Sequence, residues 1–164
     1  MKTKFLTLVL LCISIFYSNA YAQDSKKGRV QTEVELSVIG YSPNISIGAR
    51  TGYLFNESFF VGGGIGLGYD LFVKCNDDII ALQYKFFASC RYSLPISKIV
   101  DFSLGLDGGG FIEHETSKVN YLVSPRAGFG FKMGQQKKNI ISIYANYSRM
   151  GSQNLFGGTL GFSF

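Results

Sequence analysis

Leu155-Phe-Gly-Gly-Thr-Leu-Gly-Phe-Ser-Phe164 is the stretch of sequence that decides the fold. Its large apolar side chains alternate with glycine, threonine and serine. The alternating apolar positions are Phe156, Leu160, Phe162 and Phe164. Because successive side chains of a strand point to opposite faces, this pattern predicts a β-strand with one apolar face and one small, polar face. A closed sheet needs its last strand to pair with its first, so we expect residues 155–164 to close a barrel.

Seven further segments show the same alternation and are separated by turn-forming residues. In chain order they are 30–39, 45–54, 59–72, 80–92, 100–110, 121–133 and 141–148. Segments of about ten alternating residues between turns are typical of transmembrane β-barrels. No segment after residue 22 has the long apolar run of a membrane helix. The sequence therefore predicts an all-β fold, an eight-stranded antiparallel up-and-down transmembrane barrel.

The charged residues in the middle of these segments all share the parity of the small and polar residues. They are Glu33, Glu35, Asp70, Asp101 and Asp107, with Arg50, Lys85, Arg91, Arg126 and Lys132. On the opposite, apolar parity the only charge is Arg149, at a segment end. A Lys or Arg that faces lipid at mid-depth costs about 2–4 kcal/mol. We therefore expect the apolar parity to face lipid and the charged parity to face the lumen, the reverse of a soluble barrel.

The lumenal charges can compensate one another across neighbouring strands. With a turn centred on Ile96, the expected pairs are Arg91–Asp101, Lys85–Asp107, Lys132–Asp101, Arg126–Asp107 and Glu33–Arg50. Opposite charges directly across strands stabilise a sheet. Eight strands leave room only for side chains or one small ligand. We therefore expect a lumen filled by this charge network, with a bare wall of glycines at 62–68 that faces bulkier groups such as Phe87 and Tyr144.

The beginning of the chain predicts export. Lys2 and Lys4 precede an apolar run over 5–17, and Ala20-Tyr21-Ala22 follows. These are the parts of a secretory signal peptide, with cleavage before Gln23. The apolar run is shorter than the roughly 20 residues of a membrane anchor, and Leu11 before Cys12 disfavours a lipoprotein. The expected organisation is a signal peptide at 1–22, a polar lead-in at 23–29 and a barrel domain at 30–164.

Charge and chemistry-bearing residues exclude several functions. The chain carries a net charge of +5, of which two positive charges lie in the signal peptide, and it has no basic stretch interleaved with aromatics. Nucleic acid is therefore not an expected partner. His114 is the only histidine, and Glu113 and Glu115 alone make a weak metal site. The glycine runs lack the pattern of a nucleotide-binding loop. We expect no metal, no cofactor and no enzymatic activity.

Two cysteines lie in the mature chain, Cys75 and Cys90. We place Cys75 near a hairpin tip and Cys90 about a dozen residues along the next strand. At roughly 3.3 Å per residue the separation is some 30–40 Å, too long for a disulfide. Cys90 falls on the lipid-facing parity, where it acts as a small apolar residue.

Residues 30–164, with eight alternating segments and a terminal Phe164, resemble the small OmpA/OmpX-type outer-membrane proteins of Gram-negative bacteria. The resemblance implies an outer-membrane location, contact with outer-membrane lipid, and insertion by the barrel-assembly machinery, for which Phe162 and Phe164 are the assembly signal. It also implies a structural or surface-interaction role. We expect the protein to be a monomer. The longest polar connection, 111–120, is the candidate contact for an extracellular or periplasmic protein partner. Its candidate residues are Glu113, His114, Glu115 and Lys118.

Three alternatives stay open at this point. A narrow porin-like channel or transporter would need a path between the charge pairs. The second alternative is a lipid-modifying enzyme, because the outer-membrane lipid A deacylases are similar in size to this chain. They use a His-x-Ser pair with an acid, whereas this chain has Thr116 two residues after His114. A periplasmic lipocalin-like binder would share the strand count but would need an apolar interior.

Overall fold

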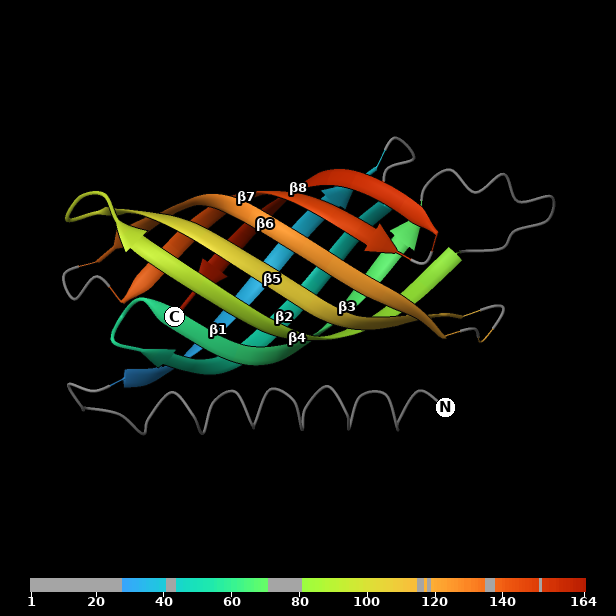
Figure 1. Ribbon diagram of the computed structural model, residues 1–164, viewed down its shortest axis with the longest axis horizontal. Coiled ribbons are helices and arrows are strands. Elements are labelled where there is room, and N and C mark those ends of the chain that lie inside the picture. The colour runs from blue at the N-terminus through green and yellow to red at the C-terminus, as the bar shows by residue number, and fades with distance from the viewer. Residues whose placement is uncertain are drawn as a thin grey trace.

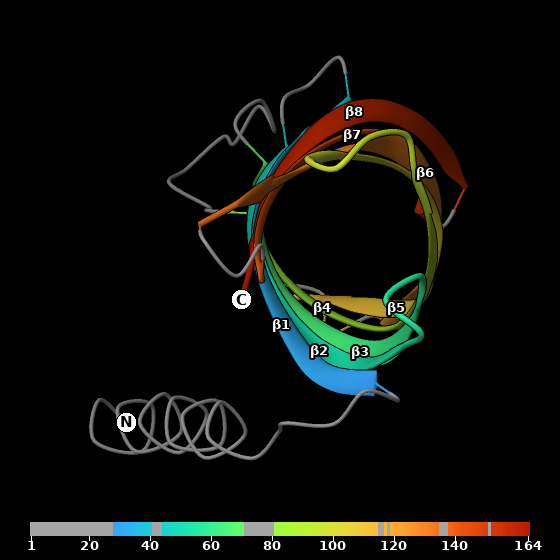
Figure 2. The same cartoon turned by 90° about the vertical axis from the view of Figure 1, so that its left-hand side faces the viewer.

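A computed structural model describes residues 28–40, 44–70, 81–114, 117, 119–134, 138–150 and 152–164. These residues form β1 (Gly28–Ile39), β2 (Asn44–Phe55), β3 (Phe59–Asp70), β4 (Ala81–Pro95), β5 (Val100–Glu113), β6 (Val119–Met133), β7 (Asn139–Met150) and β8 (Gln153–Ser163). Each strand pairs antiparallel with the next, and β8 pairs with β1 to close the barrel (Figures 1 and 2). The predicted eight-stranded antiparallel barrel is confirmed. The predicted signal peptide lies outside the described residues.

The barrel has two distinct ends. Connections 56–58 and 96–99 lie at the end where β1 begins and Phe164 lies, which we call the terminal end (Figure 1). At the opposite end, which we call the loop end, β1, β3, β5 and β7 end and β2, β4, β6 and β8 begin. Asn56 and Glu57 both have positive φ, 49° and 59°, the left-handed conformation of a tight hairpin turn.

The last strand closes the barrel, as its alternation predicted. Its pairing with β1 runs from Glu33 opposite Ser163 to Ile39 opposite Gly157. The backbone of Phe164 extends this pairing, because its N–H donates to the Thr32 carbonyl at 2.9 Å and its carbonyl accepts from the Thr32 N–H at 3.1 Å. The apolar parity of β8 faces outward, and the small, polar parity faces the lumen.

The sorting of side chains between the two faces of the wall is the reverse of that in a water-soluble protein. Ile47, Ile65 and Ile143 are each more than half exposed on the outer face. Glu33 and Arg50 lie inside, and each is only 1% exposed. An apolar surface that encircles the molecule far exceeds the few-hundred-Å² patches of soluble monomers. The wall is therefore built to face lipid.

The described residues include no helix that is long and apolar enough to cross a membrane.

Half of the connection expected at 111–120 is strand, which corrects the sequence prediction. β5 continues to Glu113 and β6 begins at Val119, so that Phe111 pairs with Asn120. Phe111 points into the lumen, is only 4% exposed, and packs with Leu122 and Met150. The polar residues of this stretch led to the prediction of a loop. A strand can hold polar side chains here, because this part of the barrel wall lies near water. The connection itself is limited to 114–118.

The predicted registers of β4 with β5 and of β5 with β6 are also corrected. Arg91 lies opposite Gly105 instead of Asp101, because Pro95 ends β4 and the hairpin is centred two residues later than expected. In the turn, the Ser97 hydroxyl accepts the Ile99 and Val100 amides at 3.3 and 3.1 Å.

Between β5 and β6, Asp101 lies opposite Gly130 and Asp107 lies opposite Ser124. Each partner is two residues away from the expected one, Lys132 for Asp101 and Arg126 for Asp107. The register of β1 with β2 agrees with the prediction, because Glu33 lies opposite Arg50.

Candidate functional site: the lumenal charge network

Arg50 of β2 is the centre of a charge network inside the barrel. Its guanidinium contacts Glu35 in a short ion pair, Asp107 at 2.9 Å and Glu33 at 3.9 Å. It also donates a hydrogen bond to the Ser89 hydroxyl at 2.8 Å. Three carboxylates from β1 and β5 thus surround one guanidinium.

Two further arginines complete the network. Arg91 of β4 contacts Glu33 in a short ion pair and donates to the Tyr144 hydroxyl and to the side-chain oxygen Oε1 of Gln31, both at 2.9 Å. Arg126 of β6 contacts Glu35 at 3.2 Å.

Arg126 also contacts Asp107 at 3.4 Å, and Ser163 donates to Glu33 at 2.9 Å. We call Glu33, Glu35, Arg50, Arg91, Asp107 and Arg126 the inner network. Charge-assisted hydrogen bonds of this kind are stronger than neutral ones.

Each arginine of the inner network also lies over an aromatic ring. Arg50 lies 5.1 Å from the ring centre of Phe87, Arg91 lies 5.2 Å from Phe60, and Arg126 lies 4.8 Å from Tyr144. The attraction of a cation to a ring face reaches about 2 kcal/mol when water is excluded.

Glycines make room for these rings. A Cβ at Gly64 would lie 2.6 Å from the Phe87 ring, and one at Gly128 would lie 2.7 Å from the Tyr144 ring. This is the bare wall opposite Phe87 that the glycines of β3 led us to expect.

Three of the ion pairs join strands that are not neighbours: Arg50 with Asp107, Arg91 with Glu33, and Arg126 with Glu35. Arg91 binds Glu33 on β1 and not Asp101 on β5. Asp107 does lie between two bases, but these are Arg50 and Arg126 instead of Lys85 and Arg126. An arginine side chain is long enough to reach the opposite wall of so narrow a barrel, and cross-strand register alone could not reveal this.

The remaining charged residues of the predicted lumen lie outside the inner network. Lys132 forms an ion pair with Asp101 at 3.0 Å near the terminal end. This pair was predicted from the sequence. Lys85 is buried near the loop end, where its ammonium donates to the Asn44 side-chain oxygen at 3.2 Å. Asp70 is the last residue of β3, and its side chain lies outside the described residues.

The lumen also contains residues that the sequence reasoning did not single out. Phe60 and Gln31 are each 1% exposed and contact Arg91, from β3 and β1. Asn44 and Asn146 line the loop-end half with several serines. All share the parity of the charged residues, and this parity was the signal that could have identified them.

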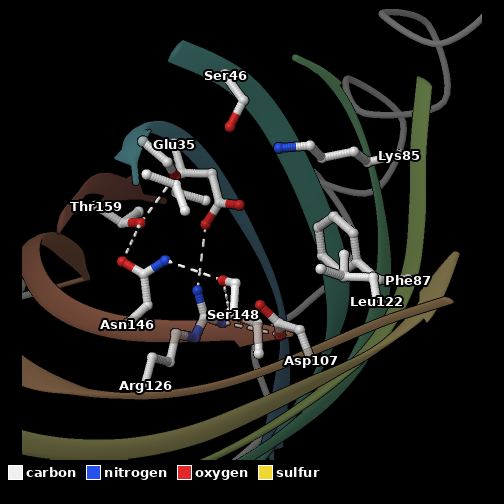
Figure 3. A pocket seen from close by; sticks show the side chains of 13 residues that line it. Glu35, Ser46, Lys85, Phe87, Asp107, Leu122, Arg126, Asn146, Ser148 and Thr159 are labelled. Carbon is white, nitrogen blue, oxygen red and sulfur yellow. Dashed lines mark hydrogen bonds and ion pairs between the residues drawn. The ribbon is translucent and has the colours of Figure 1, made fainter. Parts of the chain in front are cut away.

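A small cavity of about 40 Å³ lies between the inner network and the loop end. Figure 3 shows Glu35, Asp107 and Arg126 on its wall together with Lys85. Ile39 and Leu122 also line it. The rest of the wall is rich in hydroxyl and amide groups, from Ser37, Ser46, Ser124, Asn146, Ser148 and Thr159.

The candidate surface loop is only partly described. Glu113 ends β5, and His114 follows it, with its N–H donating to the Leu82 carbonyl at 2.9 Å and its ring packed against Tyr84. Glu115 and Lys118 lie outside the described residues. Within the described ranges, no group of three or more His, Cys, Asp or Glu side chains could hold a metal ion.

Of the two mature cysteines, Cys90 is a free thiol in β4. Cys75 lies outside the described residues, so the expected absence of a disulfide stays a prediction.

Comparison with known proteins identifies the architecture. No protein-family model matches the chain, and no curated protein matches it in sequence. Neisserial surface protein A is similar in structure, with a TM-score of 0.57 and 14% identity over 85% of this chain and 95% of that one.

The N-terminal β-barrel domain of Pseudomonas aeruginosa OprF has a TM-score of 0.53 and 11% identity over 86% of this chain and 98% of that one. The de novo designed TMB2.3 has a TM-score of 0.52 and 14% identity over 87% of this chain and 97% of that one. At such low identity the likeness shows the fold. The chain has the fold of the small eight-stranded β-barrels of bacterial outer membranes.

Proposed function

We propose that this protein is an integral outer-membrane barrel with a lumen closed by side chains, and that its role is structural or one of surface interaction without catalysis. The observation that carries the proposal is the inner network, in which each of three arginines binds an acid on a strand that is not its neighbour. An eight-stranded barrel is just wide enough for side chains to fill. Groups that bridge opposite walls leave no room for a water-filled channel at that level.

The energetics of the inner network support a permanently closed lumen. Arg50 and Glu33 are almost completely buried, and every carboxylate of the network contacts two arginines. Removing one partner of a buried ion pair costs about 3–5 kcal/mol, because the other charge is left uncompensated. Opening a path would require several such contacts to break together.

The outer surface supports residence in a membrane. Exposed aromatic side chains gather toward both rims, where the ring can contact the interface between lipid and water. At the terminal end they include Phe55, Phe59, Tyr92, Phe162 and Phe164, and toward the loop end Tyr69, Tyr84, Tyr121 and Phe156. A periplasmic lipocalin-like binder would need the opposite sorting, with polar residues outside.

Location can be tested by membrane fractionation of cells that express the full chain. We expect the protein in the outer-membrane fraction, with faster gel migration when it is unheated than when it is boiled. Recovery in the soluble fraction without detergent would overturn the membrane assignment.

Closure can be tested by single-channel recording on the purified, refolded protein in a planar bilayer. We expect no stable open conductance from the natural sequence. Arg50→Ala together with Arg91→Ala should produce conductance events, since both side chains bridge the lumen. A stable conductance of porin size from the unaltered protein would overturn the closed-lumen proposal and favour the channel alternative.

A further inference from the structure

The cavity at the loop-end half of the lumen holds a buried cation that makes no ion pair with a described side chain. Lys85 is 8% exposed, and its ammonium has no carboxylate within ion-pair distance in the described part of the chain. Its described hydrogen bond goes to the neutral Asn44 side chain at 3.2 Å. A buried charge is costly unless it is paired, so this position calls for an anion.

The carboxylates that line the same cavity already have partners. Glu35 contacts Arg50 and Arg126, and Asp107 contacts the same two arginines. These two acids and two bases compensate one another. The ammonium of Lys85 lies on the same cavity wall but makes no ion pair with a described side chain.

The side chain of Lys85 is held so that its ammonium faces the cavity. A Cβ at Gly68 would lie 3.0 Å from the Lys85 Cε, so the glycine leaves space for the lysine stem. The Asn44 amide donates to the Gln83 side-chain oxygen at 3.2 Å, which turns its own oxygen toward Lys85. In Figure 3 the lysine nitrogen points into the cavity, on the side of Ser46.

We propose that this cavity is a binding site for one small monovalent anion, held by the Lys85 ammonium and by hydroxyl groups of the wall such as that of Ser46. A lysine ammonium has three donors, and one of them is used by Asn44. A cavity of about 40 Å³ admits a few non-hydrogen atoms at most. The ligand class is therefore a halide or a small oxyanion such as nitrate or formate.

The site can be tested by chloride-35 NMR line broadening on the refolded protein in detergent, with formate as competitor. We expect saturable broadening that formate removes. Lys85→Gln should weaken chloride binding by about tenfold or more, since it deletes the charge. Lys85→Arg should retain it. Lys132→Gln is the matched control, because Lys132 is also lumenal but is paired with Asp101 at 3.0 Å, and it should bind as the natural sequence does.

Two results would overturn the proposal. One is the absence of saturable broadening in protein shown to be folded by its heat-modifiable gel migration. The other is broadening that Lys85→Gln does not reduce, which would mean adventitious surface binding. Asp70→Asn distinguishes a protein counter-charge from a bound anion, because broadening that appears only in this variant would show that Asp70 neutralises Lys85.

Anion binding and lumen closure are separate outcomes. A barrel without conductance can lack the anion, and a conducting barrel can still bind chloride at Lys85.

Discussion

Arg50 on β2 and Asp107 on β5 meet across the lumen, with their nearest atoms, Nη1 and Oδ1, 2.9 Å apart. The two residues are 57 positions apart in the chain and do not lie on neighbouring strands. Glu35 and Ser89 contact the same guanidinium from two other directions. One arginine therefore joins four strands from inside, in addition to the backbone hydrogen bonds that join them around the wall.

Removal of this arginine should weaken the whole barrel. Arg50→Met is expected to lower the free energy of unfolding by about 3–5 kcal/mol, because Glu35 and Asp107 lose a partner while buried. Urea-induced unfolding in lipid vesicles measures the change. Lys132→Met is the matched control, since Lys132 is more exposed and has one partner, and it should cost about 1 kcal/mol or less. Equal losses for the two variants would contradict the central role of Arg50.

The ion pair between Glu33 and Arg91 should show strong coupling. In a double-mutant cycle with Glu33→Gln and Arg91→Gln, we expect a coupling energy of about 1–3 kcal/mol, as contacting residues in one network give. The pair Asp101–Lys132 serves as comparison and should couple less, because Lys132 is closer to solvent. If the two cycles gave the same value, burial would not be what strengthens the Glu33 pair.

The glycine at position 64 should resist substitution. A Cβ there would lie 2.6 Å from the Phe87 ring and 2.7 Å from the Ala49 carbonyl oxygen. Gly64→Ala should therefore destabilise the barrel by about 1–3 kcal/mol through overpacking. Gly108→Ala is the control, because a Cβ at Gly108 meets nothing within 4 Å. Unfolding midpoints of the two variants would decide, and an unchanged midpoint for Gly64→Ala would show that the lumen is looser than described.

The lipid face should reject a charge at mid-depth. Ile65 lies in the middle of β3 and is exposed on the outer wall. Ile65→Lys should cost about 2–4 kcal/mol, and Tyr121→Lys near the loop end about 0–1 kcal/mol. Unfolding from vesicles gives both values. A cost for Ile65→Lys as small as that for Tyr121→Lys would mean that residue 65 does not lie in the hydrocarbon layer.

The strands and their faces could be read from the sequence because they depend on local periodicity. Alternation at 155–164 and in seven other segments fixes which side chains share a face, since the period of a strand is two. Charge then identifies the lipid side, because a misplaced Arg or Lys in hydrocarbon is costly. The register of β1 with β2 also followed, because turn-forming residues in the sequence separate the two segments and Glu33 lies opposite Arg50, as predicted.

The tertiary structure alone decided which charges meet. A shift of two residues at the hairpin after Pro95 moved Arg91 away from Asp101. Closure of the barrel then brought Arg91 to Glu33, Arg50 to Asp107 and Arg126 to Glu35 from strands that are not neighbours. The sequence by itself determined the number and order of the strands and their lipid-facing side, and it placed Glu33, Arg50 and Arg126 on the lumenal side. The pairing among those charges depends on turn geometry and on how far a side chain reaches across the lumen, and neither is encoded in a local pattern.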